Sequence, residues 1–167
     1  LWMAGPAAGL LTQPITGHVS DRTASRLGRR RPYIFIGATL AALALFAMPN
    51  APTLWTASLL LWLLTASINV AMEPFRSLVA DKLPEGRRTT GFATQVFFIG
   101  LGAVFASALP WMLANWFAVS THAEPGLLPA SVRVAFYIGG VCLFLAVGWT
   151  VLTTAENPVR PASGERD

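Results

Sequence analysis

The chain has 167 residues, of which 54% are hydrophobic and only 12% are charged, so it is too apolar to be a soluble domain of this size. Its net charge of +4 does not indicate a nucleic-acid-binding protein, because the basic residues occupy the gaps between apolar runs and are not interleaved with aromatic residues on one face. A single cysteine, Cys142, excludes an intrachain disulfide and a zinc–cysteine cluster.

Five apolar runs follow one another along the chain and predict an all-α membrane protein with five transmembrane helices. They cover about residues 1–17, 32–49, 54–80, 89–113 and 131–153. The first run begins at Leu1 without an initiator methionine, which indicates a fragment of a longer protein. The second run has no charge, so we expect it to face lipid on most sides. Glycines in the last two runs are expected to allow close helix packing: Gly91, Gly102, Gly139 and Gly140.

The third run carries a polar stripe inside its apolar sequence. Thr65, Asn69, Glu73 and Arg76 follow one another at helical spacing and therefore share one face. Arg76 is close enough to the end of the run to extend its side chain to the lipid headgroups, which is the structural alternative. Glu73 lies deeper and needs a partner or a proton, and Arg76 at i+3 is an available partner.

Ionisable groups inside a membrane usually face a cavity or a substrate path. We therefore expect a substrate-binding or coupling site at Asn69, Glu73 and Arg76. Gln95, a polar residue near the start of the fourth run, joins this candidate site.

The basic residues between the runs predict the orientation in the membrane. Ten of them fall on one side and one, Arg133, falls on the other, so the first side should be cytoplasmic. The ten are Arg22, Arg26, Arg29, Arg30, Arg31, Lys82, Arg87, Arg88, Arg160 and Arg166. Segments 17–32, 81–88 and 154–167 would then lie on the cytoplasmic side of the cell (inner) membrane, and segments 49–53 and 114–130 would lie on its outer side.

The loop between the first two runs contains a glycine, an Asp-Arg pair and a Gly-Arg-Arg group: Gly17, Asp21, Arg22, Gly28, Arg29 and Arg30. This pattern resembles the loop between the second and third helices of the major facilitator superfamily. The flanking sequences AGPAAGLLTQPITGHVSDR, TASRL and RRRPYI, followed by EPFRSLVAD and TTGFATQVFFIGLGAV, are similar to the sucrose-transporter branch of that superfamily. Bacterial members of this branch are associated with sucrose, maltose and related glucosides.

The resemblance implies that the five runs are helices two to six of a twelve-helix fold. Residues 1–153 would form part of an N-terminal six-helix bundle, and 154–167 would be a cytoplasmic tail or the linker between the two halves. The third run would be helix four, which borders the central cavity, whereas the second and fifth runs would be peripheral. The first helix and the C-terminal half of the same transporter would be absent from the chain.

The resemblance also implies a conformational latch on the cytoplasmic side, closed in the outward-facing state. It would comprise Gly17, Asp21, Arg22, Gly28, Arg29, Arg30 and Asp81. Asp21 would face the N-terminus of a helix in the absent half, where the helix dipole stabilises a carboxylate. Arg29 or Arg30 would reach Asp81 at the inner end of the third run.

The chain departs from plant sucrose carriers in its fourth helix. There an aspartate implicated in proton coupling precedes two asparagines, and the matching positions here are Thr65, Ile68 and Asn69. A Gly-Pro pair of the plant proteins is Glu73-Pro74 here, while the matching arginine, Arg76, is kept. Either the coupling carboxylate lies two turns further in, at Glu73, or the proton site lies on helices outside this chain.

These features predict a sugar:proton symporter for sucrose- or maltose-type glucosides that works by alternating access. The expected partners are the sugar, the lipid bilayer and the remaining helices, the expected coupling ion is a proton, and no metal, other cofactor or nucleic acid is expected. An exporter of another small molecule and a non-transporting membrane scaffold are the alternatives, although a scaffold leaves Glu73 unexplained. An enzyme is not indicated, because no histidine cluster, Ser-His pair or metal-ligand set is present.

Overall fold

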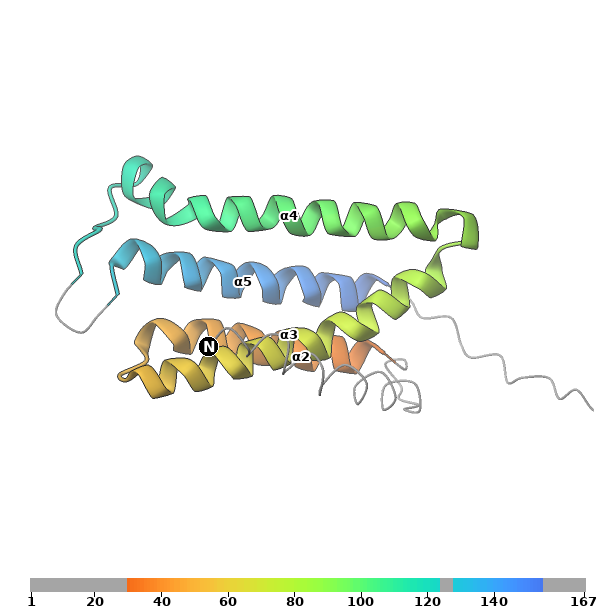
Figure 1. The fold of residues 1–167 in the computed structure, drawn as a ribbon, viewed down its shortest axis with the longest axis horizontal. Coiled ribbons are helices and arrows are strands. Elements are labelled where there is room, and N and C mark those ends of the chain that lie inside the picture. Colours follow the sequence, from red (N-terminus) through yellow and green to blue (C-terminus); the bar gives the residue numbers. More distant parts are fainter. Residues whose placement is uncertain (1–29, 124–127, 155–167) are drawn as a thin grey trace, which may run out of the picture.

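The computed structural model describes residues 30–123 and 128–154, and within these ranges every long element is a helix (Figure 1). The four α-helices are α2 (Arg31–Ala47), α3 (Leu54–Lys82), α4 (Glu85–Trp116) and α5 (Ala130–Thr153), and a short 3-10 helix, η1 (Met48–Asn50), follows α2. Helices α3, α4 and α5 are each long and apolar enough to cross a bilayer, and so is α2 together with η1, over Arg31–Asn50. The first expected run and the tail lie outside the described residues, so the count of five helices and their numbering in a twelve-helix fold stay predictions.

A capping box explains why α3 begins at the expected residue, Leu54. The Thr53 hydroxyl accepts a hydrogen bond from the backbone N–H of Thr56 at 3.2 Å, and the Thr56 hydroxyl accepts one from the backbone N–H of Thr53 at 3.1 Å. These two bonds satisfy donors that the first turn of a helix otherwise leaves without a partner.

The charged segment expected as a turn, residues 81–88, is mostly helical. α3 continues to Lys82 and α4 begins at Glu85, so only two residues separate them. Pro84, the N-cap residue of α4, has no backbone N–H and so leaves no donor unsatisfied at the start of the helix. Glu85 places a negative charge in the first turn, which the helix dipole favours. The Arg88 guanidinium donates from Nε to the backbone oxygen of Ala80 at 3.1 Å, which satisfies a carbonyl near the end of α3.

Helix α2 lies at the centre of the described bundle. It packs against α3 on one side and α5 on the other, and α5 in turn lies between α2 and α4 (Figure 1). Its buried residues are small except for one: Ile34, Gly37, Ala38, Ala41, Ala42 and Ala44. The expectation that this run faces lipid on most sides is therefore wrong. Small side chains let two neighbouring helices come close, which an apolar composition alone does not reveal.

The tightest approach of two helices is at Gly37 of α2. A Cβ atom there would lie 2.7 Å from both the backbone nitrogen of Ala71 and the backbone oxygen of Ser67, so α3 leaves no room for any side chain. Gly140 is also packed, against the Phe46 ring. A Cβ atom added at Gly102 or Gly139 would meet nothing within 4 Å, so the close packing expected at these two glycines is absent from the described part of the chain.

We expect Gly37→Ala to destabilise the protein, because its methyl group meets backbone that cannot move without separating α2 from α3. Overpacking of this kind costs about 1–3 kcal/mol. The measurement is the melting temperature of the purified full-length protein, followed by size-exclusion chromatography after heating. Gly139→Ala is the matched control, since its methyl group enters open space. Equal melting temperatures for the two variants would contradict the packing argument.

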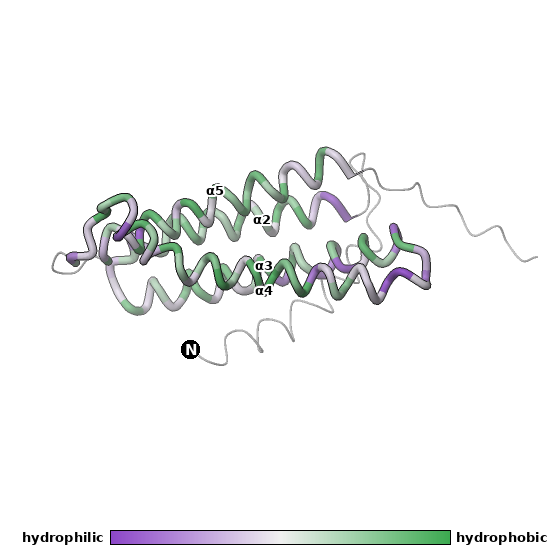
Figure 2. Tube along the Cα trace, turned by 90° about the horizontal axis from the view of Figure 1, so that it is seen from above, coloured by the Kyte–Doolittle hydropathy of each residue, from purple (hydrophilic) through white to green (hydrophobic). Residues whose placement is uncertain are grey.

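Apolar residues occupy the middle of the helices, and hydrophilic residues gather at their ends (Figure 2). Helix α4 shows this most clearly, because Leu113 is its only buried residue and it exposes Val96, Phe97, Phe98, Val104 and Phe105. Exposed side chains of this kind are stable against lipid or other membrane helices and not against water. The chain is therefore part of a multi-pass membrane protein.

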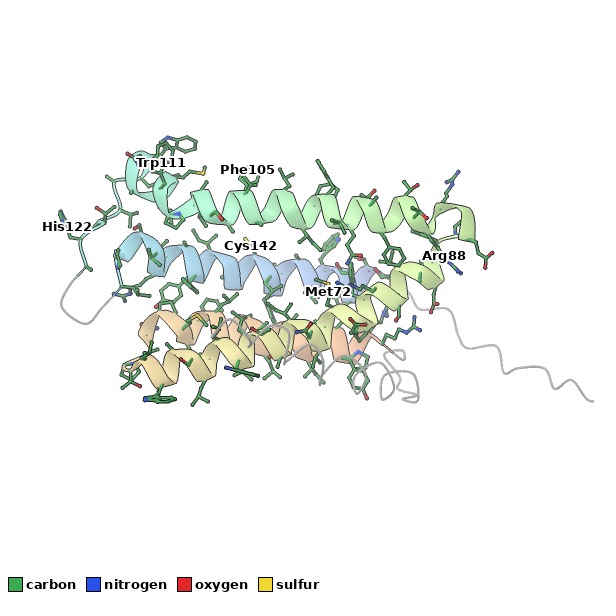
Figure 3. The ribbon with its side chains drawn as sticks, in the orientation of Figure 1. Met72, Arg88, Phe105, Trp111, His122 and Cys142 are labelled. Atoms are coloured by element: carbon green, nitrogen blue, oxygen red, sulfur yellow. The ribbon has the colours of Figure 1, made fainter. Side chains whose placement is uncertain are left out.

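The orientation is testable at the two ends of the described bundle, where Figure 3 shows Arg88 and His122. We expect a cysteine at Gly86 to be protected from a membrane-impermeant thiol reagent in intact cells and one at Thr121 to be labelled, because the basic residues favour the cytoplasmic side. The native Cys142 is a free, exposed cysteine that could itself react with the reagent, so it must be replaced first. The reverse labelling pattern would overturn the expected topology.

Candidate functional site

The charged pair expected on the third run is present on α3. Arg76 Nη1 lies 3.4 Å from Glu73 Oε1, and the side chains are 52% and 25% exposed, respectively. Because α3 continues to Lys82, Arg76 lies six residues and Glu73 nine residues before its end, about 9 Å and 14 Å along the axis. The two added residues, Asp81 and Lys82, are charged, so the apolar part of α3 still ends at Ala80 and the depth of Glu73 and Arg76 within it is unchanged.

The uncharged members of the polar stripe hydrogen-bond to their own helix. The Asn69 amide donates from Nδ2 to the backbone oxygen of Thr65 at 2.8 Å, and the Thr65 hydroxyl donates to the backbone oxygen of Leu61 at 2.8 Å. Bonds of this type, one turn back along the helix, satisfy polar groups in an apolar setting. Asn69 itself lies one turn of the helix before Glu73.

Gln95 lies on α4 and contacts Met72 of α3, the residue that precedes Glu73. Its Nε2 atom lies 3.7 Å from the sulfur of Met72, a weak acceptor, and both residues are part-buried. Figure 3 shows Met72 on the lower half of the bundle near the end that carries Arg88. Nothing in the sequence points to Met72, because a methionine in an apolar run has no polar signal. The contact with Met72 thus places Gln95 close to the polar stripe, although the sequence pattern gives no reason to expect this contact.

An ion pair joins the start of α2 to the last turn of α3. Arg30, the N-cap residue of α2, donates from Nη1 to Asp81 Oδ2. The Arg30 side chain is 10% exposed, whereas that of Asp81 is 65% exposed. Of the two arginines considered, Arg30 therefore makes this contact in the described part of the chain. The other expected members of the latch lie outside the described residues: Gly17, Asp21, Arg22, Gly28 and Arg29.

An apolar pocket of about 280 Å³ lies between α2, α3 and α5. Ile68, Met72 and Phe75 line it from α3, on a face that adjoins the polar stripe. Such a lining offers a sugar almost no hydrogen-bonding partners, so this pocket is a packing gap behind the stripe and not a candidate sugar site. Within residues 30–123 and 128–154 no three His, Cys, Asp or Glu side chains gather as ligands for a metal ion.

The chain matches the family model of the Major Facilitator Superfamily over residues 1–167. Its relatives include a general alpha-glucoside permease of Schizosaccharomyces pombe, 28% identical, and the sucrose transport protein SUC4 of Arabidopsis thaliana, also 28% identical, each over 99% of this chain. The sucrose transport protein SUT2 of Oryza sativa subsp. indica is 30% identical over 100% of it. The aligned parts are 32%, 36% and 38% of these relatives, so the chain spans about a third of their length. No solved structure matches the chain. The match to the family model over the whole chain shows that the chain belongs to the major facilitator superfamily.

Proposed function

We propose that this chain is part of the N-terminal half of a proton-coupled symporter for sucrose- or maltose-type glucosides. The observation that carries the proposal is the Glu73–Arg76 pair inside α3, in a chain whose relatives are named as sucrose and alpha-glucoside carriers. Helices that the chain lacks would complete the binding site between two halves of the transporter. The basic loops would lie on the cytoplasmic side of the cell membrane.

In this proposal Arg76 binds the sugar. A guanidinium has five N–H donors in a fixed planar arrangement, which suits neighbouring hydroxyl groups on a sugar ring. Half of the Arg76 side chain is exposed on the chain, so its donors can reach a ligand without breaking helix packing. Asn69 and Gln95 would supply further hydrogen bonds from the same region of α3 and α4.

Glu73 would hold Arg76 in place and carry the coupled proton. At 3.4 Å the Glu73–Arg76 contact is longer than a strong charge-assisted hydrogen bond, and a proton on Glu73 or a sugar on Arg76 can compensate for its loss. Protonation of Glu73 weakens its attraction for Arg76, and sugar binding draws Arg76 away from Glu73. Each ligand therefore favours the other by the same free energy, as linkage requires.

Alternating access would involve the Arg30–Asp81 ion pair at the cytoplasmic end. The pair ties α2 to α3, the helix that carries the candidate site. A bond that forms in one conformation and breaks in the other shifts the balance between them without touching the substrate.

The decisive test is uptake of radiolabelled sucrose and maltose by the full-length protein in sealed vesicles. We expect accumulation above the external concentration when a proton gradient is directed inward, and only equilibration after a protonophore is added. Accumulation that survives the protonophore would exclude proton coupling. Absence of sugar uptake, with efflux of another compound, would replace the proposal by the exporter alternative.

A further inference from the structure

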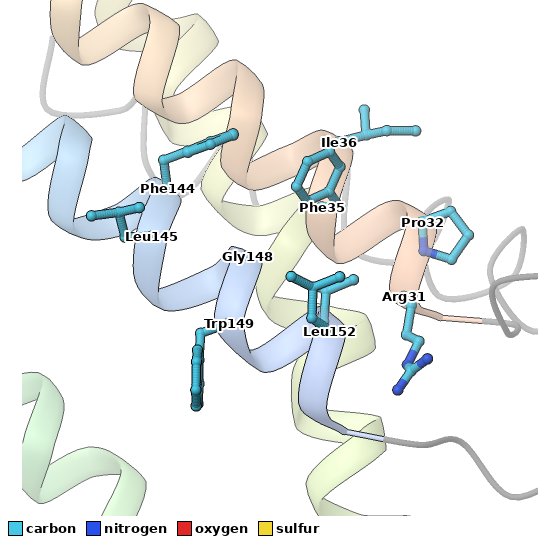
Figure 4. A pocket seen from close by; sticks show the side chains of 10 residues that line it. Arg31, Pro32, Phe35, Ile36, Phe144, Leu145, Gly148, Trp149 and Leu152 are labelled. Carbon is cyan, nitrogen blue, oxygen red and sulfur yellow. The ribbon is translucent and has the colours of Figure 1, made fainter.

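A groove runs along the described surface where α2 and α5 lie side by side (Figure 4). Its volume is about 700 Å³, within the range of about 300–1,000 Å³ that pockets for small molecules have. Phe35 and Ile36 line it from α2, and Leu145, Trp149 and Leu152 line it from α5. The groove lies apart from the polar stripe of α3 and takes no part in the proposed sugar site.

The length and position of this groove match one leaflet of a bilayer. Its lining on α5 extends from Phe144 to Leu152, about 12 Å along the helix axis, and the hydrocarbon of one leaflet is about 15 Å thick. At the deep end the rings of Phe35 and Phe144 contact each other with their centroids 5.8 Å apart. At the other end both helices reach their termini, where Figure 4 shows Arg31 and Leu152. An acyl chain that enters from the headgroup region would fill the groove to the Phe35–Phe144 contact.

The two ends of the groove also differ in charge. Arg31 is the charged residue of its lining, and it lies at the end where α2 begins. Trp149 lines the same half, one turn before the end of α5 at Thr153, and tryptophan is typical of the membrane interface. A ligand that matches this arrangement has a negative charge at one end and a hydrocarbon chain at the other.

We propose that the α2–α5 groove binds an anionic phospholipid, with the headgroup at Arg31 and one acyl chain between α2 and α5. Attraction to a basic residue near the membrane surface enriches an anionic lipid over a zwitterionic one about fivefold. The apolar lining then selects the position of the acyl chain and not the identity of the headgroup.

The test uses fluorescence quenching of Trp149 in the full-length protein. Vesicles contain equal amounts of phosphatidylglycerol and phosphatidylcholine, and bromine is placed on the acyl chains of one lipid or the other, so the overall composition stays constant. The difference between the wild type and Trp149→Phe isolates the contribution of Trp149. We expect brominated phosphatidylglycerol to occupy the groove about fivefold more than brominated phosphatidylcholine and to quench correspondingly more.

Two pairs of variants separate the headgroup from the acyl chain. Arg31→Gln should remove the preference for phosphatidylglycerol, and Arg31→Lys should keep it because the charge remains. Gly148→Leu should reduce quenching by both lipids, since a side chain at this residue meets nothing within 4 Å and projects into the groove. Gly139→Leu, on the opposite side of α5 and equally open, is the control.

Three results would overturn the proposal. Equal quenching by the two brominated lipids in the wild type would exclude anionic selectivity. A preference that persists in Arg31→Gln would move the headgroup away from Arg31. Absence of quenching by either lipid would show that another protein segment, and not a lipid, covers the groove.

Discussion

Replacing Glu73 with glutamine should abolish accumulation of sugar against a gradient and leave sugar exchange intact. Glutamine keeps the size and the hydrogen-bonding oxygen of Glu73 but cannot take up the coupled proton, so the carrier moves sugar only down its gradient. The two measurements are proton-driven uptake of labelled sucrose and its exchange for unlabelled sucrose in vesicles without a gradient. If the Glu73–Arg76 contact is only structural, both activities should be lost or both retained.

The chain contains a matched control for this substitution. Glu85 and Arg88 form a second pair at the same i, i+3 spacing, with Arg88 Nη1 3.7 Å from Glu85 Oε1 and the Glu85 side chain 90% exposed. Because this pair lies in the first turn of α4, beside the α3–α4 connection, Glu85→Gln should change neither accumulation nor exchange. An equal loss in both variants would indicate a general effect of removing a carboxylate and would count against a coupling role for Glu73.

Arg76→Lys tests whether Arg76 binds the sugar. Lysine keeps the charge but loses the planar set of donors, so at least one charge-assisted hydrogen bond to the sugar should be lost. Such a bond contributes about 1.5–3 kcal/mol, which corresponds to about a ten- to hundredfold weaker sugar affinity. Arg88→Lys is the control. Normal sugar binding by Arg76→Lys would show that the binding site lies on helices outside this chain.

The second large effect is expected at the Arg30–Asp81 ion pair. Asp81→Asn and Arg30→Gln should each lower the transport rate more than they change substrate affinity, because the pair affects the balance of conformations and touches no substrate. An exposed ion pair contributes about 0.2–1 kcal/mol, and loss of Asp81 would also leave the buried Arg30 charge without this partner, so the balance should shift by about fivefold or more. Initial uptake rates and equilibrium sugar binding measure the two quantities.

The double variant tests whether Arg30 and Asp81 affect transport through their mutual contact or independently of each other. If Arg30 and Asp81 act through their contact, Arg30→Gln combined with Asp81→Asn should lower transport no more than either change alone. Additive losses would mean that the two residues act independently. Unchanged rates in both single variants would remove the pair from the transport cycle.

Much of the helical structure follows from the sequence by itself. The expected runs coincide closely with α2, α3 and α5, because a helix that crosses a bilayer needs about 20 consecutive apolar residues and the polar gaps bound them sharply. The Glu73–Arg76 contact also follows from spacing alone, since side chains three residues apart on a helix are neighbours. The turn at residues 81–88 was harder to predict, because charged residues are equally suited to exposed helix ends.

Only the tertiary structure decided which surfaces of these helices meet. Gly37 is packed against α3 whereas Gly102 and Gly139 are open, although all three are glycines in apolar runs. Lipid and protein interior are equally apolar, so hydrophobicity cannot tell a buried helix face from one in contact with lipid. For the same reason only the tertiary structure shows the central position of α2 and the contact of Gln95 with Met72. Both depend on which helices lie next to each other, and spacing along the chain does not give this.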